Sequence, residues 1–274
     1  MSNKLCFYTK PFPGIKSYYD MIDAAAEYQL YAVEGLNHFE LEIPDIEEAK
    51  KIREYADKKH VVFPCFSAFV QFAAERDTVK RLKAYAEVAK ILGSPYLHHT
   101  IVGECKAPDK VMPYKEELFA KGTQAVREVY DYAESIGIKA IYEEQGYIFN
   151  GVKEFGRFLE QVDRNVGVVA DLGNIYQSGD DVIAFIKAHG NRVVHVHIKD
   201  VTLTDANPTG GGLKTLAGKY MHPAEVGAGD VKIKEAIRLL ENMGYDGYYG
   251  LEITLDDANP EYIQKSIQQI KALF

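Results

Sequence analysis

The sequence has few cysteines, fewer basic than acidic residues, and no long apolar run. Its three cysteines, at positions 6, 65 and 105, are odd in number and widely spaced, which excludes a disulfide framework and a CxxC zinc knuckle. With 40 acidic against 32 basic residues the formal net charge is −8, which argues against a nucleic-acid partner held through its phosphates. No stretch reaches the roughly 18 apolar residues of a membrane span, and the N-terminus lacks the apolar core of a signal peptide. We therefore expect a cytoplasmic protein with no membrane partner.

The sequence does contain a regular alternation of short β-type runs and longer helical ones. Eight predicted strands, each followed by a predicted helix, recur at spacings of about 25–40 residues. This rhythm indicates parallel βαβ units, and eight of them predict an α/β fold, a (β/α)8 TIM barrel in one domain over residues 1–274. No glycine-rich dinucleotide fingerprint follows the first strand, which argues against an open doubly wound sheet. The predicted strands are 4–9, 31–36, 61–68, 96–102, 138–145, 166–172, 192–200 and 248–254.

One segment interrupts this rhythm. Residues 201–230 contain no predicted helix or strand, and we expect an irregular, functional or mobile loop there. Asp200, just before this segment, is expected to cap or pin it. The predicted helices occupy 17–28, 45–59, 77–93, 112–137, 151–162, 180–190, 232–244 and 260–274.

Polar side chains gather where the last four predicted strands end. In a TIM barrel these ends meet at one mouth, so the side chains converge there. Several carboxylates at such a place would repel one another unless a cation lay between them. Three carboxylates and one imidazole suit one divalent metal ion, Mn²⁺, Mg²⁺ or Co²⁺, with Zn²⁺ as a further option. The residues at these ends are Glu143, Asp171, His197, Lys199 and Glu252.

The segments that carry these residues resemble the xylose isomerase-like TIM barrel superfamily, in its sugar phosphate isomerase/epimerase branch. That branch includes ketose 3-epimerases and proteins like hydroxypyruvate isomerase and inosose dehydratase. The motifs follow the family's order through the C-terminal half. The N-terminal half matches the family only in its alternation of strands and helices. They are "YEEQG" (142–146), "VADLGN" (169–174), "HVHIKD" (195–200), "VGAGDV" (226–231) and "GYDGYYGLEI" (244–253).

The resemblance implies a catalytic metal site. It makes Glu143, Asp171, His197 and Glu252 the metal ligands, with Glu143 chosen over Glu144 by the alignment of the motif. It also implies a divalent-metal-dependent sugar isomerase or epimerase that works through a metal-stabilised enediolate. Glu143 and Glu252 would then serve as the acid/base pair as well.

Further polar residues are candidates for binding a small carbohydrate or polyol substrate. Lys199 belongs to the family's HxKD signature, and an ion pair with a carboxylate is its alternative role. Gln145 and Asn174 are uncharged amides suited to sugar hydroxyls. Glu34 ends the second predicted strand and His99 the fourth, where each is a candidate either for the far end of a substrate or for a structural role.

Other functions stay open. An inosose dehydratase-like lyase acting on a keto-polyol uses related chemistry, and Asn174 stands where the epimerases usually have histidine. An endonuclease IV-like phosphodiesterase would need a three-zinc cluster, for which Ser67 and Asn174 replace histidines. A non-catalytic barrel is opposed by the intact ligand set. The oligomeric state is not fixed by these patterns, and a homo-oligomer is left open.

Overall fold

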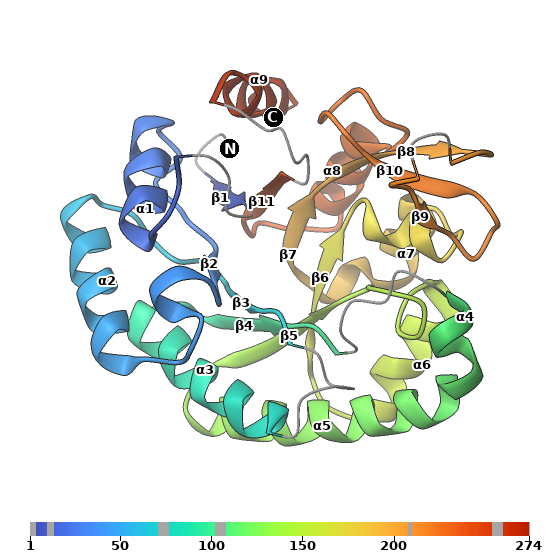
Figure 1. Ribbon diagram of the computed structural model, residues 1–274, viewed down its shortest axis with the longest axis horizontal. Helices are drawn as coiled ribbons and strands as arrows, with labels where there is room; N and C mark the ends of the chain where they lie inside the picture. The colour runs from blue at the N-terminus through green and yellow to red at the C-terminus, as the bar shows by residue number, and fades with distance from the viewer. Residues whose placement is uncertain are drawn as a thin grey trace.

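Eight parallel strands form a nearly closed barrel with helices on its outside (Figure 1). The computed structural model describes residues 4–9, 14–70, 77–101, 108–207, 210–253 and 260–273. The strand order is β1-β11-β7-β6-β5-β4-β3-β2, and a backbone bridge between Phe7 and Val33 brings β1 beside β2. The predicted (β/α)8 barrel is therefore confirmed. The strands are β1 (Leu5–Thr9), β2 (Gly35–Leu36), β3 (Phe66–Ala68), β4 (Tyr96–His99), β5 (Lys139–Glu143), β6 (Gly167–Asp171), β7 (Val193–Ile198) and β11 (Tyr249–Ile253).

Helices follow the barrel strands along the chain, as the sequence predicts. Local capping explains where several of them begin and end. The side chains of Ser17, Asp45 and Asp181 each accept a backbone N–H of the first helical turn that follows. Gly93 ends its helix in a left-handed conformation, at φ 75°. The α-helices are α1 (Tyr18–Glu27), α2 (Ile46–Lys58), α3 (Thr78–Leu92), α4 (Pro108–Val111), α5 (Lys115–Ser135), α6 (Val152–Val162), α7 (Val182–His189), α8 (Ile233–Asn242) and α9 (Pro260–Lys271).

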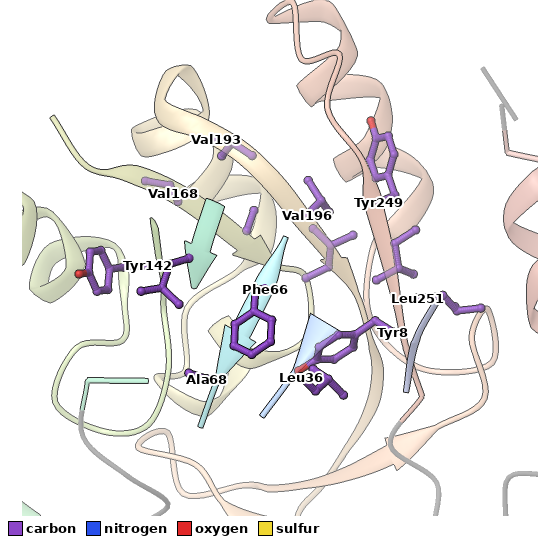
Figure 2. Packing of buried hydrophobic residues seen from close by; sticks show 14 of the residues in the cluster. Tyr8, Leu36, Phe66, Ala68, Tyr142, Val168, Val193, Val196, Tyr249 and Leu251 are labelled. Carbon is purple, nitrogen blue, oxygen red and sulfur yellow. The ribbon is translucent and has the colours of Figure 1, made fainter. Parts of the chain in front are cut away.

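The main core lies between the outer face of the barrel and the helices. Phe66 of β3 packs on Tyr85 of α3, with ring centroids 5.6 Å apart. Tyr142 of β5 packs on Phe158 of α6, with centroids 5.7 Å apart. Figure 2 shows Phe66, Tyr142 and further buried apolar side chains on neighbouring strands. This burial holds the strands in register. In the parts of the chain that the structure describes, no helix is long and apolar enough to cross a membrane.

The segment 201–230 differs from its prediction as an irregular loop. It contains a three-stranded antiparallel sheet in the order β8-β10-β9, at the right of Figure 1. Its strands are β8 (Asp200–Thr204), β9 (Leu213–Lys214) and β10 (Tyr220–Ala224). Tyr147, after β5, donates to the carbonyl oxygen of Lys214 at 2.7 Å, which ties this sheet to the C-terminal end of the barrel.

Asp200 pins the end of this segment, as the sequence predicts. Its Oδ2 accepts the backbone N–H groups of Gly227 and Gly229 at 2.8 and 3.1 Å. Its Oδ1 accepts those of Val201 and Val231 at 2.9 and 3.2 Å. The carboxylate therefore accepts four backbone N–H groups, three from the "VGAGDV" turn and one from the start of β8.

Gly229 is required for this arrangement, so Gly229→Ala is expected to destabilise the protein. An added Cβ would lie 2.1 Å from Asp200 Oδ1 and 2.6 Å from the carbonyl oxygen of Val201. Forced rearrangement of a packed site costs about 1–3 kcal/mol, which should appear as a lower Tm in thermal unfolding. Ala228→Ser, at the exposed neighbouring position, is the control and should leave the Tm nearly unchanged. Equal Tm values for both variants would contradict this account of the turn.

Candidate active site

The inner face of the barrel changes from apolar to charged along the strands. On β5, Ile141 and Glu143 point to the same face, and on β6 Val169 and Asp171 do so. Ile141 and Val169 pack with Cys65 in a small apolar cluster that is separate from the main core. The carboxylates lie two residues nearer the C-terminal end of each strand. Apolar side chains therefore fill the barrel interior toward the N-terminal ends of the strands. The charged groups lie at the C-terminal ends, where the active sites of TIM barrels are found.

The four predicted metal ligands lie together at that end, and we call them the upper polar layer (Glu143, Asp171, His197 and Glu252). The Nδ1 atom of His197 lies 3.3 Å from Glu143 Oε2 and 3.6 Å from Glu252 Oε2. Asp171 Oδ2 lies 4.0 Å from the same nitrogen. All four side chains are at most 7% exposed. Closure of the barrel thus directs three carboxylates at one imidazole nitrogen.

Lys199 joins two of these carboxylates. Its ammonium donates to Asp171 Oδ2 at 2.8 Å, lies 2.7 Å from Glu252 Oε1, and donates to Asn174 Oδ1 at 3.1 Å. The other oxygen of Asp171 accepts the backbone N–H groups of Gly173 and Asn174, both at 2.9 Å. Asp171 is therefore held by the turn that follows β6, and its Oδ2 alone faces the site.

A second set of polar side chains lies beneath, the lower polar layer (Glu34, Ser67, His98 and His195). Glu34 lies 2.7 Å from His195 Nε2 through Oε2 and 3.1 Å from His197 Nε2 through Oε1. Ser67 donates its hydroxyl to Glu34 Oε1 and lies 2.8 Å from His98 Nδ1. Glu34 is fully buried. The two layers meet at His197, whose two ring nitrogens face one layer each.

The electrostatics of the site follow from burial and close opposite charges. Burial raises the pKa of Glu252 to about 7, with Lys199 lowering it and Asp171 raising it. Burial alone would lower the pKa of Lys199, but Asp171 and Glu252 raise it above its ordinary value. Lys199 is therefore a cation, and Glu252 changes its charge near neutral pH, as a general acid or base must.

The upper polar layer fits a divalent cation. Among the described residues, His197 Nδ1 is buried and has no hydrogen-bond partner, although three carboxylates surround it. Glu143, Asp171 and His197 offer ligand atoms that all lie within 4.8 Å of one another. A donor set of carboxylate oxygens and one imidazole is suited to Mn²⁺, Mg²⁺, Co²⁺ or Zn²⁺.

Glu34 does not lie where a substrate-binding residue would be expected. Its carboxylate is 0% exposed, and both oxygens are bonded to side chains of the barrel interior. The physical reason is that β2 lies across the barrel interior from β7, so Glu34 reaches the histidines of β7 and stays below the mouth. In the structure its carboxylate contacts His195 and His197.

His99 is also engaged within the protein. Its Nε2 lies 2.9 Å from the Tyr142 hydroxyl and its Nδ1 2.9 Å from the carbonyl oxygen of Thr100, so neither nitrogen is free for a sugar hydroxyl. A small pocket nevertheless lies beside it, bordered by Gln145. The pocket is lined by His99, Thr100, Ile101, Glu143, Gln145 and Phe149.

Two residues near the site, His98 and Tyr8, had no role assigned from the motifs. His98, next to His99, points into the barrel, and its Nε2 lies 3.7 Å from Glu143 Oε1. The ring of Tyr8 stacks on His197, with centroids 4.8 Å apart. Alternation along β4 pairs His98 with Tyr96 on one face, but which face turns inward is decided by the closed barrel alone.

Fold and site together define a (β/α)8 barrel with a carboxylate–histidine centre at its C-terminal end. The family model described as "Xylose isomerase-like TIM barrel" matches residues 22–273. The chain belongs to that family.

The sequence is also similar to named relatives. An inosose dehydratase of Clostridium perfringens is 27% identical over 241 residues, which cover 83% of this chain and 81% of that protein. A D-allulose 3-epimerase structure from Methylomonas sp. superimposes with a TM-score of 0.76 and 17% identity, covering 99% and 98% of the two chains. The crystal structure of the IOLI protein with a binding zinc atom gives a TM-score of 0.68 and 19% identity over 98% and 96%.

Proposed function

We propose that the protein is a divalent-metal-dependent sugar isomerase or epimerase that moves a proton beside a carbonyl group. The observation that carries this proposal is the buried Nδ1 of His197, which faces Glu143, Asp171 and Glu252 with no hydrogen-bond partner in the described residues. Membership of the xylose isomerase-like family supports a sugar-modifying enzyme. The zinc of the IOLI protein, a structural neighbour, supports a metal at this site.

A divalent cation held by the upper polar layer would polarise a carbonyl and a neighbouring hydroxyl oxygen and so acidify the adjacent C–H. Glu252 takes that proton, the electron pair of the C–H bond forms a C=C bond, and the π pair of the carbonyl moves onto its oxygen to give an enediolate. Glu143, in its protonated form, donates a proton to the other face of the same carbon and so inverts it. Protonation of the former carbonyl carbon instead, with the enediolate's hydroxyl proton passing to the former carbonyl oxygen, gives the isomer. Lys199, beside Glu252, donates to a substrate oxygen that gains negative charge.

Asn174 and Gln145 are placed to orient the substrate. The side-chain Nδ2 of Asn174 is buried without a hydrogen-bond partner among the described residues, so it can donate to a hydroxyl. Gln145 is half-buried at the pocket beside Glu143. Neither amide carries charge, which suits a neutral polyol.

A second candidate is a keto-polyol dehydratase, and the similarity to inosose dehydratases over most of the chain favours it. The first step is the same: Glu252 or Glu143 removes the proton beside the carbonyl. The enediolate then expels a hydroxyl group from the next carbon, and a protonated side chain supplies the proton that makes the leaving group water. Because both reactions begin with the same proton transfer, only the product distinguishes an isomerase or epimerase from a dehydratase.

We expect the protein, loaded with Mn²⁺, to exchange the α-proton of one member of a panel of ketoses, hydroxypyruvate and keto-inositols for deuterium in D₂O. NMR of the products separates the candidates, because an epimer or isomer keeps its oxygen count and a dehydrated product loses one water. Chelation should abolish exchange, and Mn²⁺ should restore it. Absence of bound metal in the purified protein, together with no metal-dependent thermal shift, would support a non-catalytic barrel.

A further inference from the structure

Glu34 lies between the two histidines of β7 and is the centre of the lower polar layer. Its Oε2 lies 2.7 Å from His195 Nε2, and its Oε1 lies 3.1 Å from His197 Nε2. It also accepts the hydroxyl of Ser67. A buried carboxylate is stable in such a place because both of its oxygens are paired.

The backbone leaves room for this carboxylate. Gly250 of β11 is paired with His197 in the barrel register. A Cβ at that position would lie 3.1 Å from Glu34 Oε2 and 3.3 Å from His197 Cδ2. The absent side chain thus lets Glu34 and the imidazole lie against β11.

The contact to Glu34 decides which nitrogen of His197 faces the upper polar layer. A carboxylate accepts hydrogen bonds and donates none, so His197 Nε2 must carry a proton. The other nitrogen, Nδ1, is then the one that can offer a lone pair to a cation held among Glu143, Asp171 and Glu252.

The hydrogen bonds of Glu34 reach His98 through Ser67. Because Ser67 donates its proton to Glu34, its oxygen must accept from His98 Nδ1, which lies 2.8 Å away. His98 Nε2 is then the nitrogen left to face Glu143 Oε1, at 3.7 Å. One buried carboxylate therefore orients two imidazoles at the site.

We propose that Glu34 is a positioning residue that presents His197 Nδ1 as the metal-ligating nitrogen. The inference rests on the proposed function, because it presumes that the upper polar layer holds a divalent ion. Carboxylates that accept the second N–H of a ligating histidine fix its tautomer and raise its basicity, and losing them costs about 10–100-fold in metal affinity.

Two variants separate the acceptor from the charge. Glu34→Met removes both, so His197 Nε2 loses its acceptor and the ring is no longer held. Glu34→Gln keeps a carbonyl oxygen that can accept from His197 and Ser67, but it loses the charge. We expect Zn²⁺ affinity, measured by isothermal titration calorimetry, to decrease from the native protein to Glu34→Gln and further to Glu34→Met, the last by about 10–100-fold.

Nitrogen NMR of the Zn²⁺-loaded protein shows which nitrogen of His197 binds the metal. A purely structural role of Glu34 would leave this nitrogen unchanged. In the native protein and in Glu34→Gln, zinc should bind His197 through Nδ1 with a proton retained on Nε2. In Glu34→Met we expect zinc to bind through either nitrogen of His197, or not to bind His197 at all. Glu144→Met is the matched control, since Glu144 is equally buried and has no hydrogen-bond partner among the described residues.

The outcomes distinguish this inference from the proposed function. If the native protein binds Zn²⁺ and both Glu34 variants bind it within twofold through the same nitrogen, Glu34 has no positioning role and the metal site stands. If the native protein binds no divalent ion, the proposed function fails and the inference fails with it. Should Glu34→Met not fold, Glu34→Gln decides alone: a Zn²⁺ affinity equal to that of the native protein would overturn the proposal.

Discussion

Glu252→Gln is expected to lower the rate of substrate proton exchange by about 10²–10⁴-fold, the contribution of a positioned general acid or base. Glutamine has the same shape and can still accept from Lys199, which lies 2.7 Å from Glu252 Oε1. It cannot take up a proton, so the other carboxylate of the pair, Glu143, would have to act alone. Burial raises the pKa of Glu252 to about 7, which suits it to take and return a proton near neutral pH. The measurement is deuterium incorporation at saturating Mn²⁺.

Two controls keep this result interpretable. Metal affinity of Glu252→Gln must be measured separately, because Glu252 also belongs to the proposed ligand set. Glu144→Gln is the matched variant, because Glu144 is equally buried, burial raises its pKa, and neither of its carboxylate oxygens has a hydrogen-bond partner among the described residues. Its exchange rate should stay close to that of the native protein. Undiminished exchange in Glu252→Gln would show that another group removes the proton.

The sequence predicts the barrel well because its strands and helices alternate with clear local signals. N-cap side chains such as Asp45 and a left-handed glycine such as Gly93 mark the helix boundaries locally. The second strand was harder to delimit. Of the predicted segment 31–36, Gly35 and Leu36 alone form regular strand, because Ala32 and Val33 make isolated bridges to different neighbours.

The small antiparallel sheet of segment 201–230 could not be predicted for a different reason. Its strand β9 has two residues, and β10 contains Pro223, which lacks a backbone N–H. Such strands carry almost no periodicity. Contacts of Asp200 with Gly229 and of Tyr147 with Lys214 hold this sheet in place, and they join residues far apart in the sequence.

The roles of Glu34 and His98 depend on closure of the barrel. Alternation groups His195 with His197 on one face, but no local pattern says that Glu34, 161 residues earlier than His195, meets them. Likewise, the sequence "YLHHT" places His98 and His99 on opposite faces without saying which face is inside. Both questions are decided by which strands face each other across the interior, which sequence periodicity does not encode.

Lys199→Met is expected to destabilise the metal-free protein by about 3–5 kcal/mol, because it leaves buried charges without their partner. In the native protein the ammonium bonds Asp171 Oδ2 and Glu252 Oε1, at 2.8 and 2.7 Å. Methionine fills similar space but provides no charge, so the two carboxylates repel each other and lose solvation. A divalent cation at the same carboxylates would replace the missing charge. Mn²⁺ should therefore raise the Tm of Lys199→Met more than that of the native protein.

The comparison is thermal unfolding with chelator and with Mn²⁺, for Lys199→Met and for a matched surface variant. Lys265→Met removes an ammonium whose partner, Glu225, is 2.5 Å away but exposed, so its Tm should change little in either condition. Because the ammonium and the cation repel each other, Lys199→Met should also bind Mn²⁺ more tightly than the native protein does. A variant that is destabilised but not rescued by Mn²⁺, Mg²⁺, Co²⁺ or Zn²⁺ would mean that Lys199 is the permanent cation of this site, and that the carboxylates around His197 do not hold a metal.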